Sequence, residues 1–148
     1  MLEKIKKERK IEGIITGAIA SNYQKERIEK ICNELNLKCF NPLWEMNQIK
    51  LLHELVENDF KIMIVGFASA GFDESWLGKI INEKTIKELE ALEKKFQINP
   101  AGEGGELESL VIDCPLFEKK LEITKAEKEV HGLQGELKII KAELKKKK

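Results

Sequence analysis

The sequence is poor in the residues that build disulfide frameworks and metal sites. It has only three cysteines among 148 residues, and no two of them form a C-x-x-C pair. This spacing excludes a disulfide-rich scaffold and a zinc ribbon, so reduced thiols are expected. The two histidines, His53 and His131, have no nucleophile near them in the sequence. We interpret both as structural residues.

Excess charge and long apolar runs are missing as well. The 26 Lys and Arg residues balance 26 Asp and Glu residues, which gives no general reason to expect nucleic-acid or membrane-surface binding. The two longest uncharged runs, residues 13–24 and 62–72, are each about half as long as a membrane-spanning helix requires. Residues 1–10 are too charged for a signal peptide. These absences predict a cytoplasmic protein with no membrane segment and no direct nucleic-acid partner.

Apolar residues recur in the order strand, helix, strand, helix, strand. Strands are predicted at 11–17, 38–40 and 61–67, and helices at 2–10, 22–36, 47–58 and 83–96. The third strand is nearly continuous in apolar residues, which is typical of a strand covered on both faces. The order predicts an α/β fold with an open parallel, Rossmann-like sheet. Ligands should then bind at the carboxyl ends of its strands.

The pattern changes after residue 97. A glycine-rich loop at 99–106 precedes a short strand near 110–114, and two segments, 119–130 and 133–145, then alternate polar and apolar residues. Alternation on both sides of a turn predicts a two-stranded antiparallel appendage. We therefore expect half of an α/β domain at 1–97 and a small α+β, substrate-binding appendage at 98–148.

The strongest local signal is the acidic loop, residues 102–108, with the sequence Gly-Glu-Gly-Gly-Glu-Leu-Glu. Its glycines permit sharp bends, and no basic residue occurs between Ala101 and Asp113. Carboxylates would repel a phosphate, so this is a poor phosphate cradle. The loop could bind a cation, hold Mg²⁺ or act as a general base on ammonia or an amine. A solvated acidic turn is the plainer alternative.

Two weaker signals follow the predicted strands. Ser21 can cap a helix with Gln24 three residues later, and the free amides there could receive an anion, with Arg27 one turn further on. Trp44 and Trp76 are the only tryptophans. Their rings could hold a quaternary ammonium group through cation–π attraction, or they could pack in the core.

Four blocks of the sequence together resemble the diphthine:ammonia ligase family, ATP-dependent enzymes of the PP-loop (N-type ATP pyrophosphatase) class with a Rossmann-like, HUP-like fold. The blocks are Gly17-Ala18-Ile19-Ala20-Ser21 with Tyr23, Gln24 and Arg27; Leu43-Trp44; Ala70-Gly71-Phe72-Asp73-Glu74 with Leu77-Gly78-Lys79; and Gly102-Glu103-Gly104-Gly105-Glu106 with Glu108 and the run 113–117. The resemblance covers about residues 10 to 120.

The resemblance implies ATP-dependent amidation of diphthine on elongation factor 2, in which ammonia attacks an acyl-adenylate. ATP with Mg²⁺ is the implied cofactor, and the implied partners are ammonia and elongation factor 2 that carries diphthine. We assign Glu103 and Glu106 to binding or deprotonating the ammonium, and Trp44 or Trp76 to the trimethylammonium group. Gly17 and Ala18 are assigned to the nucleotide. The substrate-binding set is Ser21, Tyr23, Gln24, Arg27, Trp44, Gly71, Asp73, Glu74, Trp76, Gly104, Gly105 and Glu108. One shared pocket should contain these groups.

The sequence departs from the family pattern in three places. Leu107 and Ser109 replace an aromatic residue and Thr, and Met46 and Asn47 replace an Arg-Asp pair. The Ser-Gly-Gly-Lys-Asp-Ser loop that grips ATP phosphates is absent. We therefore expect a truncated reading frame or a front half supplied by another polypeptide, and no activity from the chain alone. The exposed edge of strand 11–17 would invite association, including homo-oligomers. The alternative is a noncatalytic docking half of a split ligase.

Overall fold

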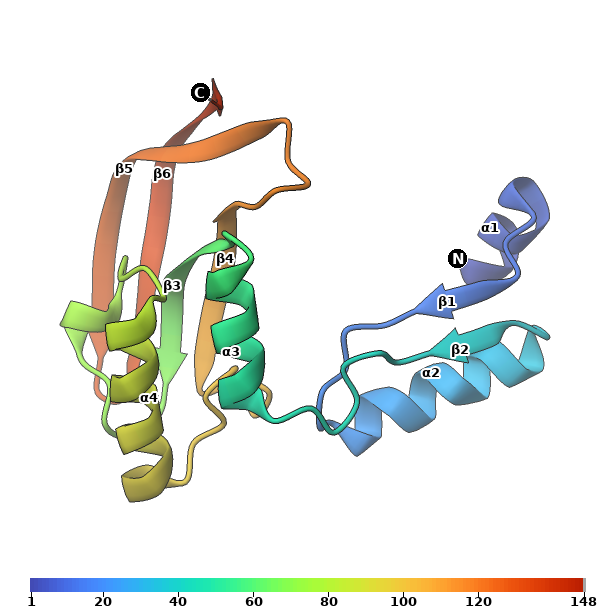
Figure 1. Cartoon of the computed structure of the whole chain (residues 1–148), viewed down its shortest axis with the longest axis horizontal. Coiled ribbons are helices and arrows are strands. Elements are labelled where there is room, and N and C mark those ends of the chain that lie inside the picture. Colours follow the sequence, from blue (N-terminus) through green and yellow to red (C-terminus); the bar gives the residue numbers. More distant parts are fainter. Residues whose placement is uncertain (148) are drawn as a thin grey trace. The chain divides into compact units, whose positions relative to one another are not determined.

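The computed structural model describes residues 1–147. Its elements are α1 (Leu2–Arg9), β1 (Gly13–Ile15), α2 (Asn22–Glu34), β2 (Lys38–Phe40), α3 (Gln48–Glu57), β3 (Lys61–Ala68), the short 3₁₀ helix η1 (Glu74–Trp76), α4 (Glu83–Phe96), β4 (Leu107–Asp113), β5 (Lys119–His131) and β6 (Gln134–Lys146). They form two compact units, and the division between the units falls after Met46 (Figure 1).

The smaller unit contains the predicted parallel strand pair. β1 pairs with β2 in parallel, with Ile14 opposite Cys39. Helix α2 connects the two strands, and the Ser21 side chain caps it by accepting from the Gln24 N–H at 3.4 Å. Cys32 of α2 is fully buried, and burial raises the pKa of its thiol. A strand–helix–parallel strand unit therefore forms here, as the sequence predicts.

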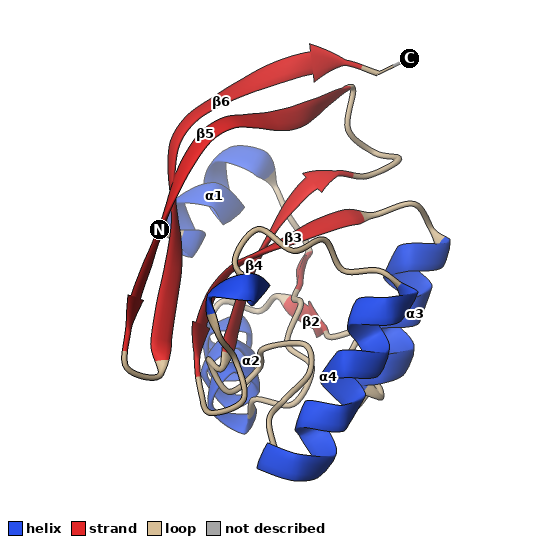
Figure 2. Cartoon of the chain, turned by 90° about the vertical axis from the view of Figure 1, so that its left-hand side faces the viewer, coloured by secondary structure: helices blue, strands red, loops and turns tan. Residues whose placement is uncertain are grey.

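The larger unit is an antiparallel sheet covered on one face by helices. The strand order is β4-β3-β6-β5, and α3 and α4 lie on the same side of β3 and β4 (Figure 2). Apolar side chains of both layers form one core, because burying them stabilises the fold. The core includes Leu52, Ile62, Ile64, Phe67, Ile86, Leu89, Leu107 and Leu137.

The predicted place of strand 61–67 in the parallel sheet is wrong. β3 pairs antiparallel with β4 on one edge and with β6 on the other. An apolar run shows that a strand is buried but does not set its direction, which depends here on partners that come much later in the chain. The register also shifts between Ile64 and Gly66, so that Phe67 returns to the core face.

The predicted division at 97/98 differs from the structure for the same reason. Because β3 hydrogen-bonds to β4 and β6, the segment 47–97 belongs with the C-terminal strands and not with β1 and β2. The predicted antiparallel hairpin is present as β5 and β6. It is not a separate appendage, because residues 134–136 of β6 also pair with β3.

The predicted helices are confirmed within a few residues at each end. Asn47 caps α3 by accepting from the Lys50 N–H at 2.9 Å, and Asn82 caps α4 by accepting from the Lys84 and Thr85 N–H groups, both at 3.0 Å. Such side chains satisfy amides that lack a partner within the helix. In the part of the chain that the structure describes, no helix has the length and apolar character needed to cross a bilayer.

Leu89 lies fully buried between α4 and the sheet. We expect Leu89→Ala to lower the free energy of unfolding by about 2–5 kcal/mol, because it leaves a cavity that the core cannot fill. Leu116→Ala is the control, because Leu116 is 86% exposed, and its effect should stay within about 0.5 kcal/mol. Urea unfolding measures both, and similar losses for the two variants would contradict this core.

Candidate functional site

The loops that follow β1 and β2 lie together in the smaller unit. The Glu45 N–H donates to the Ile19 carbonyl at 2.8 Å, and the Thr16 hydroxyl donates to the Asn41 side-chain oxygen. Parallel strands end at the same edge of a sheet, which is why the two loops meet. Neither residue was predicted to be functional, although Thr16 lies at the end of the predicted strand 11–17 and Asn41 directly follows the predicted strand 38–40.

Polar side chains at the start of α2 form hydrogen bonds within the helix. The Ser21 hydroxyl serves as the cap, and the Arg27 Nη1 donates to the Tyr23 hydroxyl at 2.6 Å. Tyr23 is 70% exposed, and Gln24 and Arg27 are exposed too. These predicted substrate-binding residues therefore share one exposed surface of the smaller unit.

Trp44 already has a cation over its ring. The Lys25 Nζ lies 4.2 Å from the ring centroid, and Trp44 is half-buried. The ring thus makes a cation–π contact with a lysine of this chain, and its predicted contact with a quaternary ammonium group stays a prediction. Ala18 is buried nearby in the chain, whereas a Cβ on Gly17 would meet nothing within 4 Å.

In the larger unit, hydrogen bonds to α3 and β3 fix the acidic loop. Gln48, the first residue of α3, donates from Nε2 to the Asn99 Oδ1 at 3.1 Å. Its Oε1 accepts from the Ala101 N–H at 2.9 Å. The Ala68 N–H of β3 donates to the Glu106 carbonyl at 2.9 Å. The loop is thus attached to a helix at one end and to a strand at the other.

Two glycines of this loop are required by close approaches. Gly102 has a φ of +80°, and a Cβ there would lie 2.3 Å from the Leu107 carbonyl oxygen. A Cβ on Gly104 would lie 2.5 Å from the Glu106 Oε1 and 2.7 Å from the Asn99 Nδ2. The glycines therefore allow the backbone to pass tightly around the Glu106 carboxylate.

One oxygen of the Glu106 carboxylate is satisfied and the other is not. Oε1 accepts from the Asn99 Nδ2 at 2.8 Å and from the Asn99 N–H at 3.3 Å. Oε2 is buried and has no hydrogen-bond partner within residues 1–147. A buried acceptor without a partner costs about 1–3 kcal/mol, so an N–H donor from a ligand would be favourable there. Glu103 is half-buried in the same loop.

Trp76 belongs to the core, which corrects its predicted role. It is only 6% exposed, and it meets the Phe72 ring edge to face at a centroid distance of 5.0 Å. The Lys79 Nζ lies 4.2 Å from its ring centroid, and Lys79 also forms an ion pair with Glu88. A ring buried in this way is closed to a trimethylammonium group, which leaves Trp44 as the candidate.

Asp73, Glu74 and Gly71 shape the turn around η1. Hydrogen bonds from the Ser75 hydroxyl and N–H hold the pKa of the Asp73 carboxyl below its ordinary value. The Glu74 side chain is exposed, and its carbonyl accepts from the Lys128 Nζ at 3.1 Å. Gly71 has a φ of +94°. These residues are not among those that line the pocket beside the acidic loop.

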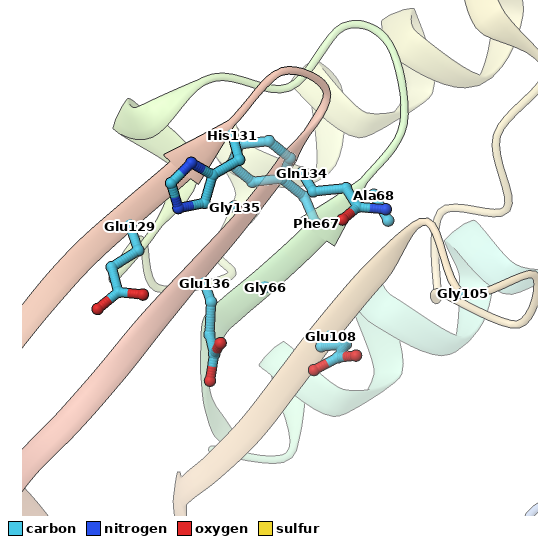
Figure 3. Close-up of a pocket in the computed structure, with 10 residues that line it drawn as sticks. All are labelled: Gly66, Phe67, Ala68, Gly105, Glu108, Glu129, His131, Gln134, Gly135 and Glu136. Carbon is cyan, nitrogen blue, oxygen red and sulfur yellow. The ribbon is translucent and has the colours of Figure 1, made fainter.

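That pocket lies on the sheet face opposite α3 and α4 and has a volume of about 330 Å³. Glu108, Glu129 and Glu136 line it from three strands, with His131 at the hairpin end (Figure 3). Gly66 stands between them, because it pairs with Glu108 on one side and with Glu136 on the other. A Cβ on Gly66 would lie 3.3 Å from Glu108, so glycine keeps the pocket open.

The structure brings together only part of the predicted site. Gly105 and Glu108 line the pocket, whereas Glu106 bonds to Asn99 within the acidic loop. The other residues that line the pocket were not predicted to do so: Gly66, Phe67, Ala68, Glu129, His131, Gln134, Gly135 and Glu136. For the residues of β5 and β6, the available signal was the period-two spacing on both sides of the hairpin turn, which places alternate residues on one face. The predicted shared pocket also draws on the smaller unit, and it stays a prediction.

Metal binding finds no support in the described residues. No group of three or more His, Cys, Asp or Glu side chains within 1–147 is arranged to hold a metal ion.

Two family models match the chain. Residues 1–39 match the diphthamide synthase N-terminal domain, and residues 47–145 match the diphthamide synthase C-terminal domain. The N-terminal match agrees with the expected PP-loop class of fold. The boundary between the two matches also agrees with the structural division after Met46.

Relatives named diphthine–ammonia ligase align over most of the chain. The protein of Mus musculus is 40% identical over 133 residues, and that of Rattus norvegicus is 39% identical over the same length. The Schizosaccharomyces pombe protein is 42% identical over 122 residues. The alignments cover 89% of this chain and 49% of each rodent protein, and 82% of this chain and 20% of the yeast protein. The chain thus spans about half the length of the rodent relatives.

The two positive-φ glycines of the acidic loop provide a matched test of its geometry. Gly105 has a φ of +84° but open space around a Cβ, whereas Gly102 would meet the Leu107 carbonyl. We expect Gly105→Ala to cost about 1–2 kcal/mol of unfolding free energy from backbone strain alone. Gly102→Ala should cost clearly more. Chemical denaturation measures the difference, and equal losses would show that the close approach at Gly102 is absent.

Proposed function

We propose, because the chain belongs to the diphthamide synthase family, that it forms part of a ligase of diphthamide biosynthesis. Such a ligase joins ammonia to the carboxylate of diphthine. ATP supplies the activation, because it converts this carboxylate to an acyl-adenylate with loss of pyrophosphate. Ammonia then forms the new C–N bond at the acyl carbon, AMP leaves, and one proton must be removed from the nitrogen.

The unsatisfied Glu106 oxygen carries the chemical part of this proposal. A carboxylate can accept N–H bonds from ammonium and can take up the proton released when ammonia becomes an amide. Asn99 orients the carboxylate through Oε1, which leaves Oε2 for the nitrogen. Glu103, three residues earlier in the same loop, adds negative charge that favours ammonium over anions. We assign both residues to the ammonia site.

The nucleotide fits the chain only in part. Gly17 and Ala18 are assigned to ATP, but the Gly17–Ser21 loop has one glycine and no lysine, and a phosphate cradle needs several backbone donors and a lysine. We therefore assign phosphate binding to a PP-loop that this sequence does not contain. Mg²⁺ would be held mainly through phosphate oxygens, as is usual for nucleotide enzymes.

The proposed protein substrate is elongation factor 2 that carries diphthine, in the cytoplasm. The Trp44 ring, which holds the Lys25 ammonium at 4.2 Å, would take the trimethylammonium group in its place or on its other face. Ile15 and Phe40 pair in the β1–β2 sheet and are 75% and 60% exposed. We propose that another polypeptide or a second copy covers these side chains.

A noncatalytic docking half of a split ligase is the second candidate. The absence of the Ser-Gly-Gly-Lys-Asp-Ser run favours it, since such a half would recognise the substrate while its partner binds ATP. The two candidates differ at Glu106, because only the first requires its charge for the chemical step.

The test is amide formation by the chain assembled with a polypeptide that carries the PP-loop. With ATP, isotope-labelled ammonium and diphthine-bearing elongation factor 2, mass spectrometry measures the label in the product. We expect Glu106→Gln to lower the rate by about 10²–10⁴-fold, the usual contribution of a general base. The variant keeps an acceptor for Asn99, so the loop should stay folded.

Glu118→Gln is the matched control, because Glu118 is exposed in the turn between β4 and β5. Its rate should equal that of the unsubstituted chain. An unchanged rate for Glu106→Gln would reject the assigned role. Label incorporation by assemblies in which both loop glutamates are replaced would favour the docking half.

Nucleotide binding gives a separate prediction. Losing two charge-assisted phosphate contacts, each worth about 1.5–3 kcal/mol, weakens binding by about 10²–10⁴-fold. The chain alone should therefore show no micromolar affinity for ATP with Mg²⁺ in calorimetry, and it should release no pyrophosphate. Micromolar binding by the chain alone would place the phosphates on residues of this chain.

A further inference from the structure

The sheet face away from α3 and α4 carries a row of carboxylates across its strands. Glu108, Gly66, Glu136 and Glu129 are successive register partners on β4, β3, β6 and β5. Opposite residues on neighbouring strands point to the same face, and like charges placed opposite each other are unfavourable. The side chains of Glu108, Glu136 and Glu129 therefore share one face of the sheet. Gly66, between Glu108 and Glu136, has no side chain to fill the space there.

Cations of the chain neutralise little of this charge. Glu129 lies 3.6 Å from the Lys138 Nζ, and both side chains are about half exposed, so this pair is weak. Glu108 and Glu136 form no ion pair with any residue in 1–147. The pocket of about 330 Å³ that these carboxylates line is thus a negatively charged hollow.

A second hollow on the same sheet has a lining in which apolar side chains stand beside Lys61, Asp113, Lys120 and Glu122. Met63 and Ile112 contribute to it from β3 and β4, and Leu121 and Ile123 contribute from β5. Its volume is about 380 Å³. Residues 120–123 of β5 lie far from the hairpin turn. They line this hollow together with residues of β3 and β4, although β5 pairs with neither of these strands.

The two hollows open on the same face of the sheet. Leu110 follows Glu108 by two residues, so both point to one face, and Leu110 is the register partner of Met63. Two residues of β3 lie between Met63 and Gly66, and one of them is extra at the register shift. The partners Leu110 and Glu108 are two positions apart on β4, which corresponds to about 7 Å along the strand. An extended ligand chain covers this distance with two residues, and side chains two residues apart point to the same face.

We propose that this face docks an extended polypeptide segment of a partner protein. A Lys or Arg of the segment enters the acidic hollow at Gly66, and an apolar side chain two residues away enters the hollow at Met63. The complementary charge and the paired hollows select such a segment over a free cation or an anionic polymer. This interaction depends neither on ATP nor on the amide-forming reaction, so it stands apart from the proposed function.

The experiment uses the full chain, isotope-labelled, and a short synthetic peptide with two Lys residues, each followed two residues later by Leu. NMR shift changes are followed during titration. We expect the amides of Gly66, Gly135 and Ile123 to move, and salt to weaken binding. Replacing Lys by Glu in the peptide should abolish binding, and replacing Leu by Ser should weaken it about tenfold or more.

Variants of the chain complete the test. Glu108→Gln combined with Glu136→Gln should weaken binding by about tenfold or more, and Leu121→Ser should do so through the other hollow. Glu57→Gln combined with Glu93→Gln is the matched control, because these glutamates lie on α3 and α4 over the opposite face, and it should leave the affinity unchanged. Equal binding of the Glu peptide, shift changes confined to α3 and α4, or equal losses in the control would each overturn the proposal.

Discussion

The backbone hydrogen bonds on both edges of β3 hold the larger unit together. One edge pairs with β4, and the other pairs first with residues 78–81 and then with β6. Because successive side chains of a strand point to opposite faces, this pairing decides what each face carries. Ile62, Ile64 and Phe67 point to the helices, whereas Met63 and Gly66 point to the other face and define its two hollows.

The same strand positions the acidic loop. The Ala68 N–H at the end of β3 holds the Glu106 carbonyl, and Gln48 at the start of α3 holds Asn99 and Ala101. The Glu106 carboxylate is therefore oriented from both sides before any ligand arrives. Preorganised charge of this kind loses little energy to rearrangement when a proton moves. Helix α3 also contributes Leu52 to the core, so loop position and core packing depend on each other.

Local patterns predicted local structure well. The periodicity of residues 83–96 gave α4 at its observed bounds, and alternation around His131 and Gly132 gave the β5–β6 hairpin. The partners of β3 were not predictable, because an apolar strand fits either sheet and the choice depends on long-range pairing. The acidic loop was found from its composition, whereas the pocket at Gly66 was not, since register across four strands creates it. The predicted role of Trp76 was wrong because a tryptophan that follows a strand has the same local sequence pattern whether it packs in the core or lines a pocket.

Amide hydrogen exchange tests most directly the central claim that Gln48 and β3 fix the acidic loop. The Ala101 N–H, which donates to the Gln48 Oε1 at 2.9 Å, should exchange slowly in the unsubstituted chain. In Gln48→Ala it should exchange about tenfold faster or more, because the local opening that exposes it becomes easier. The Ile64 N–H, bonded to the Lys79 carbonyl at 2.9 Å, should keep its rate. Fast exchange of Ala101 in the unsubstituted chain, or an unchanged rate in the variant, would contradict the account.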